Sequence, residues 1–220
     1  HIIDVELKKE LKFYKQHKTS IFSIQSNPFK NHFYTADLEG EIAVWGSESL
    51  NLLTILPLNC GKIRRININN DGSFIVVSCQ DGKIRIFDTQ FYNEVYSSYK
   101  HKEGVTSAIF NPTNNDIIIS GGKDALIKVT NWKEDILIKK IPAHNFAIYD
   151  IIVFEGLKLF ITGSRDKSIK TWNLNDYSFI NKIDKKEGGH THSINDLENI
   201  DLSTFASVSD DKRIIIWKFN

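Results

Sequence analysis

Two columns of residues recur along the chain at nearly one spacing, and this repeat constrains the fold more than any other feature. An acidic residue returns at steps of 42 to 45 residues, and an aromatic residue follows most copies six positions later. Periods of 20 to 50 residues are typical of repeat architectures, so each period should be one structural unit. The acidic column is Glu39, Asp81, Asp124, Asp166 and Asp211, and the aromatic column is Trp45, Phe87, Trp172 and Trp217, with Thr130 as the exception.

A third column, of histidines, lies at the start of the units. A histidine stands four positions before the first β-branched residue of a hydrophobic run in four of the five units. Only the second unit lacks it and carries Asn59 instead. Three columns that keep one period are a specific signal. The histidines are His17, His101, His144 and His190.

Short hydrophobic runs between these columns predict β-strands. Runs such as 74–77 and 214–217 are rich in β-branched and aromatic residues, and turn pairs such as Asp81-Gly82 bound them. No window of eleven or more residues carries a convincing period of 3.6 residues. We therefore expect an all-β chain.

A unit with a histidine near its start, an acidic tight turn and a tryptophan near its end resembles the WD40 repeat. The resemblance covers essentially the whole chain. It implies that each unit forms four antiparallel strands, called a to d in chain order. These four strands make one blade of a β-propeller around a central channel. We expect a single propeller domain over 1–220, with strands c and d of a preceding blade at 1–16 and repeat units at 17–58, 59–100, 101–143, 144–189 and 190–220.

The strand count predicts part of a larger ring. Ile2–Leu7 and Leu11–Lys15 are expected to be the leading strands c and d, and the last unit supplies only three strands. The chain opens inside a blade and contains no methionine. We therefore expect these five units and two strands to be part of a seven-bladed propeller. The alternative is a five-bladed ring closed by Leu11–Lys15, which would leave Ile2–Leu7 surplus.

The resemblance also implies a buried hydrogen-bonded tetrad of histidine, hydroxyl, aspartate and tryptophan in each blade. The carboxylate fixes one imidazole tautomer, and the hydroxyl joins the other ring nitrogen to the indole N–H. Unit one carries Glu39 in the aspartate place, unit three carries Thr130 in the tryptophan place, and unit two keeps only Asp81 and should be held mainly by packing. The complete sets are His144, Thr162, Asp166 and Trp172, and His190, Ser207, Asp211 and Trp217.

Catalytic and metal-binding interpretations are weaker. Serine, histidine and aspartate together suggest an acyl-transfer triad, but an enzyme needs one triad and not several partial copies. His190 and His192 resemble a metal pair, yet His190 already belongs to the tetrad pattern. We see no clustered carboxylates, histidines or metal ligands that would converge on the channel. We therefore expect no catalytic residue, no metal and no cofactor.

Ten positions are expected to form a partner-binding face, which we call the narrow face. Five follow the first β-branched residue of strand a, and five precede the acidic turn position. They differ from unit to unit, as partner specificity would require, and aromatic residues and arginine dominate binding hot spots. Phe146 could extend this face. The ten residues are Phe22, Arg64, Thr106, Tyr149, Asn195, Leu38, Gln80, Lys123, Arg165 and Asp210.

Composition limits the function classes. Lys and Arg number 28 against 27 Asp and Glu, so a generally basic surface for nucleic acid or anionic membrane is excluded. Two cysteines and no glycosylation sequon indicate a reducing cytoplasm. We expect a non-catalytic interaction scaffold, a monomeric propeller within a complex, that binds an acidic or aromatic peptide or protein. The alternatives are an enzyme that uses the channel and a nucleic-acid-binding propeller.

Overall fold

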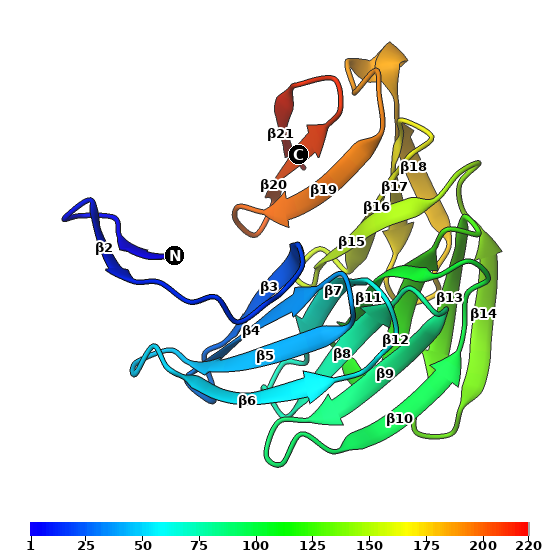
Figure 1. Ribbon diagram of the computed structural model, residues 1–220. Helices are drawn as coiled ribbons and strands as arrows, with labels where there is room; N and C mark the ends of the chain where they lie inside the picture. Colours follow the sequence, from blue (N-terminus) through cyan, green and yellow to red (C-terminus); the bar gives the residue numbers. More distant parts are fainter. Residues whose placement is uncertain (220) are drawn as a thin grey trace.

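The computed structural model describes residues 1–219 and consists of blades arranged around an axis (Figure 1). Four antiparallel sheets have four strands each, a fifth has three, and a two-stranded hairpin stands apart. Within the described residues the helical content is one 3₁₀ turn, η1 (Lys185–Glu187), and no helix there is long and apolar enough to cross a membrane. The all-β prediction is confirmed, and the arrangement is a propeller of five blades.

Each blade is a meander in which consecutive strands pair in chain order. Every blade lies within the bounds of one repeat unit, and Asn220, the last residue of the fifth unit, lies outside the described residues. Blade 1 contains β3 (Ile21–Asn27), β4 (His32–Asp37), β5 (Glu41–Gly46) and β6 (Leu52–Pro57); blade 2 contains β7 (Ile63–Ile68), β8 (Phe74–Cys79), β9 (Lys83–Asp88) and β10 (Glu94–Tyr99); blade 3 contains β11 (Val105–Asn111), β12 (Asn114–Gly122), β13 (Leu126–Asn131) and β14 (Ile136–Pro142); blade 4 contains β15 (Ile148–Phe154), β16 (Leu159–Ser164), β17 (Ile169–Asn173) and β18 (Phe179–Ile183); blade 5 contains β19 (Ile194–Asn199), β20 (Thr204–Ser209) and β21 (Ile214–Lys218).

The first strand of each blade is the innermost. Strand β3 packs beside β7, β7 beside β11, β11 beside β15 and β15 beside β19. In blade 3 burial is highest on the inside: every residue of β11 is buried, whereas six of the seven residues of β14 are exposed. The five inner strands therefore line the central channel.

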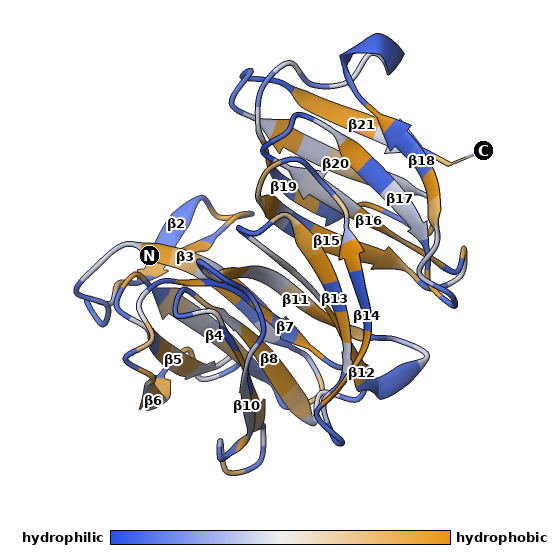
Figure 2. Cartoon of the chain, turned by 90° about the vertical axis from the view of Figure 1, so that its right-hand side faces the viewer, coloured by the Kyte–Doolittle hydropathy of each residue, from blue (hydrophilic) through white to orange (hydrophobic). Residues whose placement is uncertain are grey.

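Hydrophobic clusters between neighbouring blades form the core. Ile42 of blade 1 packs in one cluster with Ile75 of blade 2, and Ile127 of blade 3 in another with Phe160 of blade 4. Figure 2 shows hydrophobic residues alternating with hydrophilic ones along many strands, as expected for side chains that point to opposite faces of a sheet. A blade cannot bury its faces alone, so each blade depends on its neighbours.

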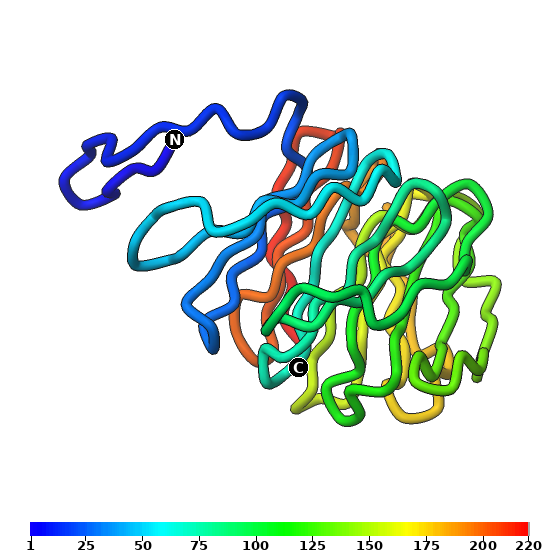
Figure 3. The backbone as a smooth tube through the Cα atoms, turned by 60° about the horizontal axis from the view of Figure 1, so that its bottom comes forward, coloured from blue at the N-terminus to red at the C-terminus, as the bar shows by residue number. Residues whose placement is uncertain are grey.

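The N-terminal hairpin extends away from the blades (Figure 3). It consists of β1 (Ile2–Asp4) and β2 (Lys9–Lys12), so the strand bounds predicted at Ile2–Leu7 and Leu11–Lys15 were wrong. Strand β1 ends early because the Asp4 carboxylate accepts a hydrogen bond from the Leu7 backbone N–H at 2.8 Å and forms a turn. Within residues 1–219, β2 pairs with β1 and β21 pairs with β20, so the closure of the last blade by residues 11–15 does not form.

Candidate partner-binding face

The acidic column builds the turns between strands b and c. The carboxylates of Asp81 and Asp166 each accept a hydrogen bond from the backbone N–H two residues further on, at 2.9 and 3.0 Å. The residue after the acid has a positive φ in every blade, and Gly82 adopts it at 86° without strain. These turns place the residue just before the acid at one end of the propeller.

Blade 4 contains a complete tetrad. His144 Nδ1 lies 2.9 Å from Asp166 Oδ2, and His144 Nε2 lies 2.7 Å from Thr162 Oγ1, which also accepts the Trp172 indole N–H at 3.0 Å. Burial lowers the pKa of His144 despite the opposing effect of Asp166. The neutral ring therefore donates from Nδ1 to the carboxylate. Although burial opposes it, hydrogen bonding to His144 and Ser168 holds the pKa of Asp166 well below its usual range.

Blade 5 repeats this geometry. His190 Nδ1 lies 3.0 Å from Asp211 Oδ2, and His190 Nε2 lies 2.8 Å from Ser207 Oγ. The Trp217 indole N–H donates to the same Ser207 oxygen at 2.8 Å. The Arg213 guanidinium donates to Asp211 as well, at 2.9 Å. These groups hold the loop into the blade against its b–c turn.

In blade 1 the tetrad carboxylate is Asp37, so the assignment of Glu39 was wrong. Asp37 Oδ2 lies 3.1 Å from His17 Nδ1, while Asp37 Oδ1 accepts the backbone N–H groups of Glu39 and Glu41 at 3.0 and 2.9 Å. Asp37 stands at the end of β4, where its short side chain points into the blade, whereas Glu39 is exposed in the turn. Thr35 completes the set, because its hydroxyl lies 2.7 Å from His17 Nε2.

Blade 3 lacks the tryptophan bond. His101 lies 2.8 Å from Asp124 and 2.9 Å from Ser120 through its two ring nitrogens. The Trp132 indole donates instead to the Asn115 carbonyl at 2.7 Å. Within residues 1–219 the buried hydroxyl of Thr130 has no hydrogen-bond partner.

Blade 2 has neither a histidine nor a hydroxyl at the tetrad positions, where Asn59 and Val77 stand. Its Asp81 carboxylate pairs with the Arg85 guanidinium, with Asp81 Oδ2 lying 2.6 Å from Arg85 Nη2. Buried Cys60 and Cys79 are free thiols packed in the cluster between blades 1 and 2. The ion pairs of Arg85 with Asp81 and Glu94, together with apolar packing, hold this blade.

Five of the ten predicted narrow-face residues line a single depression of 250 Å³. It lies where loops and inner strands of blades 2, 3 and 4 meet. Lys62, which stands just before β7, lines it too. The predicted residues that meet there are Arg64, Gln80, Thr106, Lys123 and Tyr149.

Thr106 differs from its predicted role as an exposed rim residue. It is 2% exposed, and its hydroxyl donates to the Gly121 carbonyl at 3.0 Å and to the Ile148 carbonyl. Threonine is short enough to turn its hydroxyl onto the neighbouring backbone, so it forms the floor of the depression. It is not available to select a partner.

The other predicted residues surround this depression or bond to one another. Phe22 and Leu38 are exposed, and Lys62 Nζ stands 3.2 Å from the centre of the Phe22 ring. The Asn195 amide donates to Asp210 at 2.6 Å, so these two predicted residues bond to one another. Exposed Phe146 lies beside Arg165, whose guanidinium carbon is 5.9 Å from its ring centre.

The depression is electrically positive. Burial lowers the pKa of Lys62, and the nearby positive charges of Arg64 and Lys123 lower it further. Burial likewise lowers the pKa of Arg64, whose guanidinium carbon lies 4.4 Å from the centre of the Tyr149 ring. Among the described residues, no carboxylate oxygen lies within 4.0 Å of a nitrogen of these three cations.

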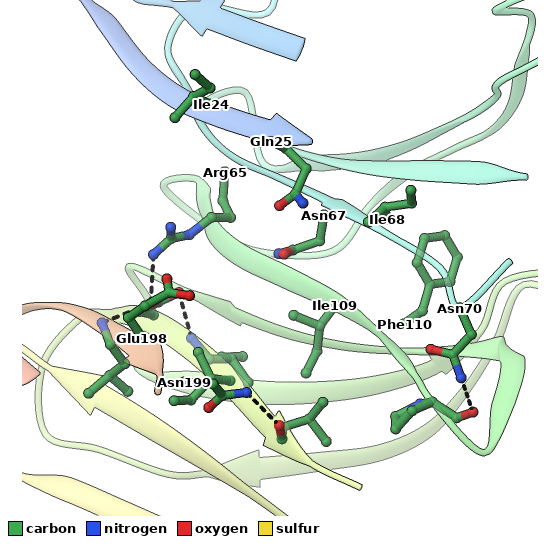
Figure 4. A pocket seen from close by; sticks show the side chains of 16 residues that line it. Ile24, Gln25, Arg65, Asn67, Ile68, Asn70, Ile109, Phe110, Glu198 and Asn199 are labelled. Atoms are coloured by element: carbon green, nitrogen blue, oxygen red, sulfur yellow. Dashed lines mark hydrogen bonds and ion pairs between the residues drawn. The ribbon is translucent and has the colours of Figure 1, made fainter. Parts of the chain in front are cut away.

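A charged cluster inside the channel corrects the expectation that no carboxylates converge there (Figure 4). Arg65 Nη2 lies 2.6 Å from Asp150 Oδ2 and also contacts Asp196. Burial raises the pKa of Asp150 to about 7, with the Asp196 carboxylate adding to the effect of burial and Arg65 opposing it. Asp150 further accepts the backbone N–H of Leu197 at 3.0 Å.

The signal for this cluster was present in the sequence. The residue two positions after the first β-branched residue of strand a is polar in all five units, and its side chain points into the channel or onto the next blade. In blade 1, for example, the Ser23 hydroxyl accepts the Ile66 N–H at 3.0 Å. This column consists of Ser23, Arg65, Ser107, Asp150 and Asp196.

The grouping of possible metal ligands in the described residues is His17, Asp37 and Glu41. His17 and Asp37 already belong to the tetrad of blade 1. His192 instead bonds to the Thr191 hydroxyl at 3.0 Å. His17 and Asp37 therefore belong to a structural network in which the polar groups hydrogen-bond to one another.

Four segments of the chain match the family model described as "WD domain, G-beta repeat". They together cover more than half of the chain, and the WD40 resemblance is confirmed. Each segment begins at or within the outer strand of one blade and ends with the third strand of the next, so the sequence repeat joins neighbouring blades. The matched segments are 51–88, 93–131, 136–173 and 182–218.

Known relatives match at modest identity. Protein hir1 of Schizosaccharomyces pombe is 23% identical over 193 residues, which cover 74% of this chain and 21% of hir1. Elongator complex protein 2 of the same organism is 32% identical over 120 residues, or 50% of this chain and 16% of that protein. The chain thus spans about a fifth or less of these relatives.

Solved structures share the fold. The crystal structure of the RRP9 WD40 repeats superposes with a TM-score of 0.82 at 21% identity, over 93% of this chain and 62% of that one. Together with the matched segments and the blade geometry, this likeness fixes the family. The chain belongs to the WD40 repeat family of β-propellers.

Proposed function

We propose that this chain is a non-catalytic scaffold that binds a peptide or protein partner on the narrow face. One observation carries the proposal: residues that vary from unit to unit come together around a single depression, although the first and last of them, Arg64 and Tyr149, are 85 positions apart in sequence. The tetrad positions repeat because the fold uses them. The depression is different, because no carboxylate among the described residues pairs with its three cations.

The chemistry of the narrow face suits a protein segment. Arg64 lies over the Tyr149 ring, Phe22 stands exposed next to Lys62, and Phe146 stands exposed next to Arg165. Aromatic and arginine side chains of this kind dominate protein–protein hot spots. A partner with acidic groups would meet the cations, and an apolar or aromatic side chain would cover the phenyl rings.

The relatives support the proposal that this chain acts as part of a protein complex. The name of Elongator complex protein 2 places that relative in a complex. By analogy we propose that this chain, as a monomeric propeller, also contributes to a complex. The free thiols of Cys60 and Cys79 are compatible with the proposed cytoplasmic location, where thiols stay reduced.

The channel supports the alternative of an enzyme less well. A carboxylate pair that acts as acid and base needs at least one free partner for substrate. Here Asp150 is buried and bound to Arg65, which also holds Asp196. For the alternative of nucleic-acid binding, the near-zero net charge leaves only the local positive depression.

A capture experiment tests the proposal. The wild-type chain and the double variant Arg64→Glu, Tyr149→Ala are immobilised and exposed to a lysate of the cells that produce the protein. The matched control is Lys140→Glu, Phe91→Ala, which makes the same kinds of change at exposed residues of strand β14 and of the turn before β10. We expect wild type and control to capture the same partners and the narrow-face variant to lose them. Equal capture by all three chains would exclude the narrow face as the binding surface.

A further inference from the structure

Three cations from two blades converge on the depression of the narrow face. Lys62 and Arg64 come from the start of blade 2, and Lys123 comes from the b–c turn of blade 3. Gln80 and Tyr149 complete the wall. The hollow measures 250 Å³, somewhat less than the roughly 300–1,000 Å³ of small-molecule pockets. It suits a single charged group on a larger partner better than a whole cofactor.

Several other half-buried cations of the chain have an acceptor among the described residues, and Lys128 and Lys170 donate to the backbone carbonyls of Lys100 and Ala143. Arg65 has Asp150, Arg85 has Asp81, and Lys100 Nζ lies 2.7 Å from Asp135. For Lys62, Arg64 and Lys123 the described residues provide no such carboxylate. Lys62 and Arg64 are partly removed from water, and exposed Lys123 adds a third positive charge beside them, so desolvation and mutual repulsion raise the free energy of the empty face. An anion seated among them would offset both effects.

The cations are also held in position with their hydrogen-bond donors available. The Arg64 guanidinium carbon lies 4.4 Å from the centre of the Tyr149 ring, and among the described residues its N–H groups donate to no oxygen acceptor. The Phe22 ring lies under Lys62 Nζ. Gln80 Oε1 accepts the Lys62 backbone N–H at 3.2 Å, and this bond leaves the Gln80 NH₂ group as a donor.

Charge number discriminates between anions. A carboxylate brings one negative charge, and a phosphodiester of a nucleic acid also brings one. A phosphorylated side chain carries about −1.5 to −2 at neutral pH and offers three strong acceptor oxygens. Three cations with an arginine fork, which can bind two phosphate oxygens at once, complement that group best.

We propose that the depression binds the phosphate of a phosphorylated side chain on the partner. This inference rests on the proposed function, because it specifies the group that the same face holds. The phosphate oxygens accept hydrogen bonds from the Arg64 guanidinium and from the ammonium groups of Lys62 and Lys123. Tyr149 and Phe22 flank the residues on either side of it.

The probe is a short degenerate peptide library with a fixed central residue, carrying phosphothreonine, threonine or glutamate there. Binding is measured by fluorescence anisotropy. We expect wild type to bind the phosphothreonine library at least about tenfold more tightly than the other two, because hydrogen bonds between charged groups are stronger than those of a neutral hydroxyl and phosphate brings more charge than a carboxylate. Equal binding of the three libraries would overturn the inference.

Variants locate the effect. Lys62→Gln with Lys123→Gln keeps the side-chain length and removes two charges, and we expect it to abolish the preference for phosphothreonine. Arg64→Lys keeps the charge but loses the fork, and we expect a partial loss. The matched control, Lys140→Gln with Lys30→Gln at two exposed positions, should keep the preference. A preference that survives in the Lys62, Lys123 variant would contradict the assigned site.

Two further arms separate this inference from the proposed function. If capture of the partner depends on Arg64 and Tyr149 but survives phosphatase treatment of the lysate, the narrow face binds a protein and the phosphate assignment is wrong. If a single-stranded DNA oligonucleotide competes as well as the phosphopeptides do, the site recognises a phosphodiester backbone and the inference also fails. We expect phosphatase treatment to abolish capture and DNA to compete weakly.

Discussion

Blades 2 and 4 have the same four-stranded meander but different interiors. In blade 4, His144, Thr162, Asp166 and Trp172 form a closed set of hydrogen bonds, and the Asp166 side chain is 8% exposed. In blade 2, valine and phenylalanine occupy the hydroxyl and indole places, and Asp81 turns to Arg85. The Asp81 side chain is 31% exposed.

The difference shows that the tetrad is not what makes a blade. Blade 2 buries its faces against blades 1 and 3, with Ile75 in one cluster and Val76 in the other. Packing between blades is therefore sufficient for the fold. The tetrad adds a buried polar network whose members depend on one another, so blade 4 should be more sensitive than blade 2 to the loss of any one polar group.

Removing the carboxylate should give the largest difference between blade 4 and blade 2 in lost stability. Asp166→Ala leaves buried His144 and the backbone N–H groups of Asn145 and Ser168 without their acceptor, and we expect blade 4 to lose about 3 kcal/mol of opening free energy. Asp81→Ala should cost blade 2 about 1 kcal/mol, because its pair is partly solvated and Glu94 lies 3.5 Å from Arg85. Native-state hydrogen exchange resolved by blade measures both losses. Equal losses would contradict the distinction.

Removing the hydroxyl should have the next largest effect. Thr162→Val keeps the shape but leaves the Trp172 indole N–H and one His144 nitrogen unpaired, at a cost of about 2 kcal/mol. The reciprocal change in blade 2, Val77→Thr, buries a hydroxyl where neither histidine nor indole is present, and it should destabilise that blade. Urea unfolding of the two variants checks this reciprocity. A stabilised Val77→Thr variant would show that blade 2 has hidden acceptors.

Acidification should weaken blades 3 and 4 before blade 2. Burial lowers the pKa of His101 and His144 below the ordinary value of 6.5, so the unfolded chain takes up their protons first. The stability that the neutral rings contribute is present above pH 6.5 and is lost as the pH falls through their folded pKa values. The lowered pKa of Asp166 extends the loss to more acidic pH. Hydrogen exchange between pH 7 and 5 should show falling protection in blades 3 and 4 but little change in blade 2.

The smallest effect concerns blade 3, whose tetrad is incomplete. Thr130 is 1% exposed, and its hydroxyl has no partner among the described residues. Thr130→Val replaces that hydroxyl with a methyl group of similar size and should stabilise the chain by up to about 1 kcal/mol. Thermal unfolding would detect the rise. A clear destabilisation would mean that the hydroxyl makes a hydrogen bond, for instance to a water molecule.

The sequence predicted those features that the period itself encodes. The residue pattern predicted the strands, and the WD40 resemblance that the period carries implied the blades and the histidine-to-hydroxyl bonds. The column alignment missed Asp37 because it assumes that the carboxylate stands at the same position in every unit. In blade 1 the Asp37 side chain, two positions earlier than Glu39, points into the blade and bonds to His17. The bond between Arg65 and Asp150 joins residues 85 positions apart, and only the curvature of the blade stack brings them together.

The narrow face shows the same limit. Spacing placed Arg64, Lys123 and Tyr149 at one end of the propeller, and the structure brings them to one depression. The sequence spacing could not show that Thr106 turns its hydroxyl onto the backbone. Nor did it single out Lys62, because its position, one residue before the first β-branched residue of strand a, carries no repeated signal.

Hydrogen exchange of the chain with and without its captured partner tests the central claim most directly. If the narrow face binds the partner, protection should rise in the segments 61–64, 80–82, 104–106 and 123–125, and the outer strands β10 and β14 should not change. Protection confined to β10, β14 or the N-terminal hairpin, with the narrow-face segments unchanged, would contradict the account.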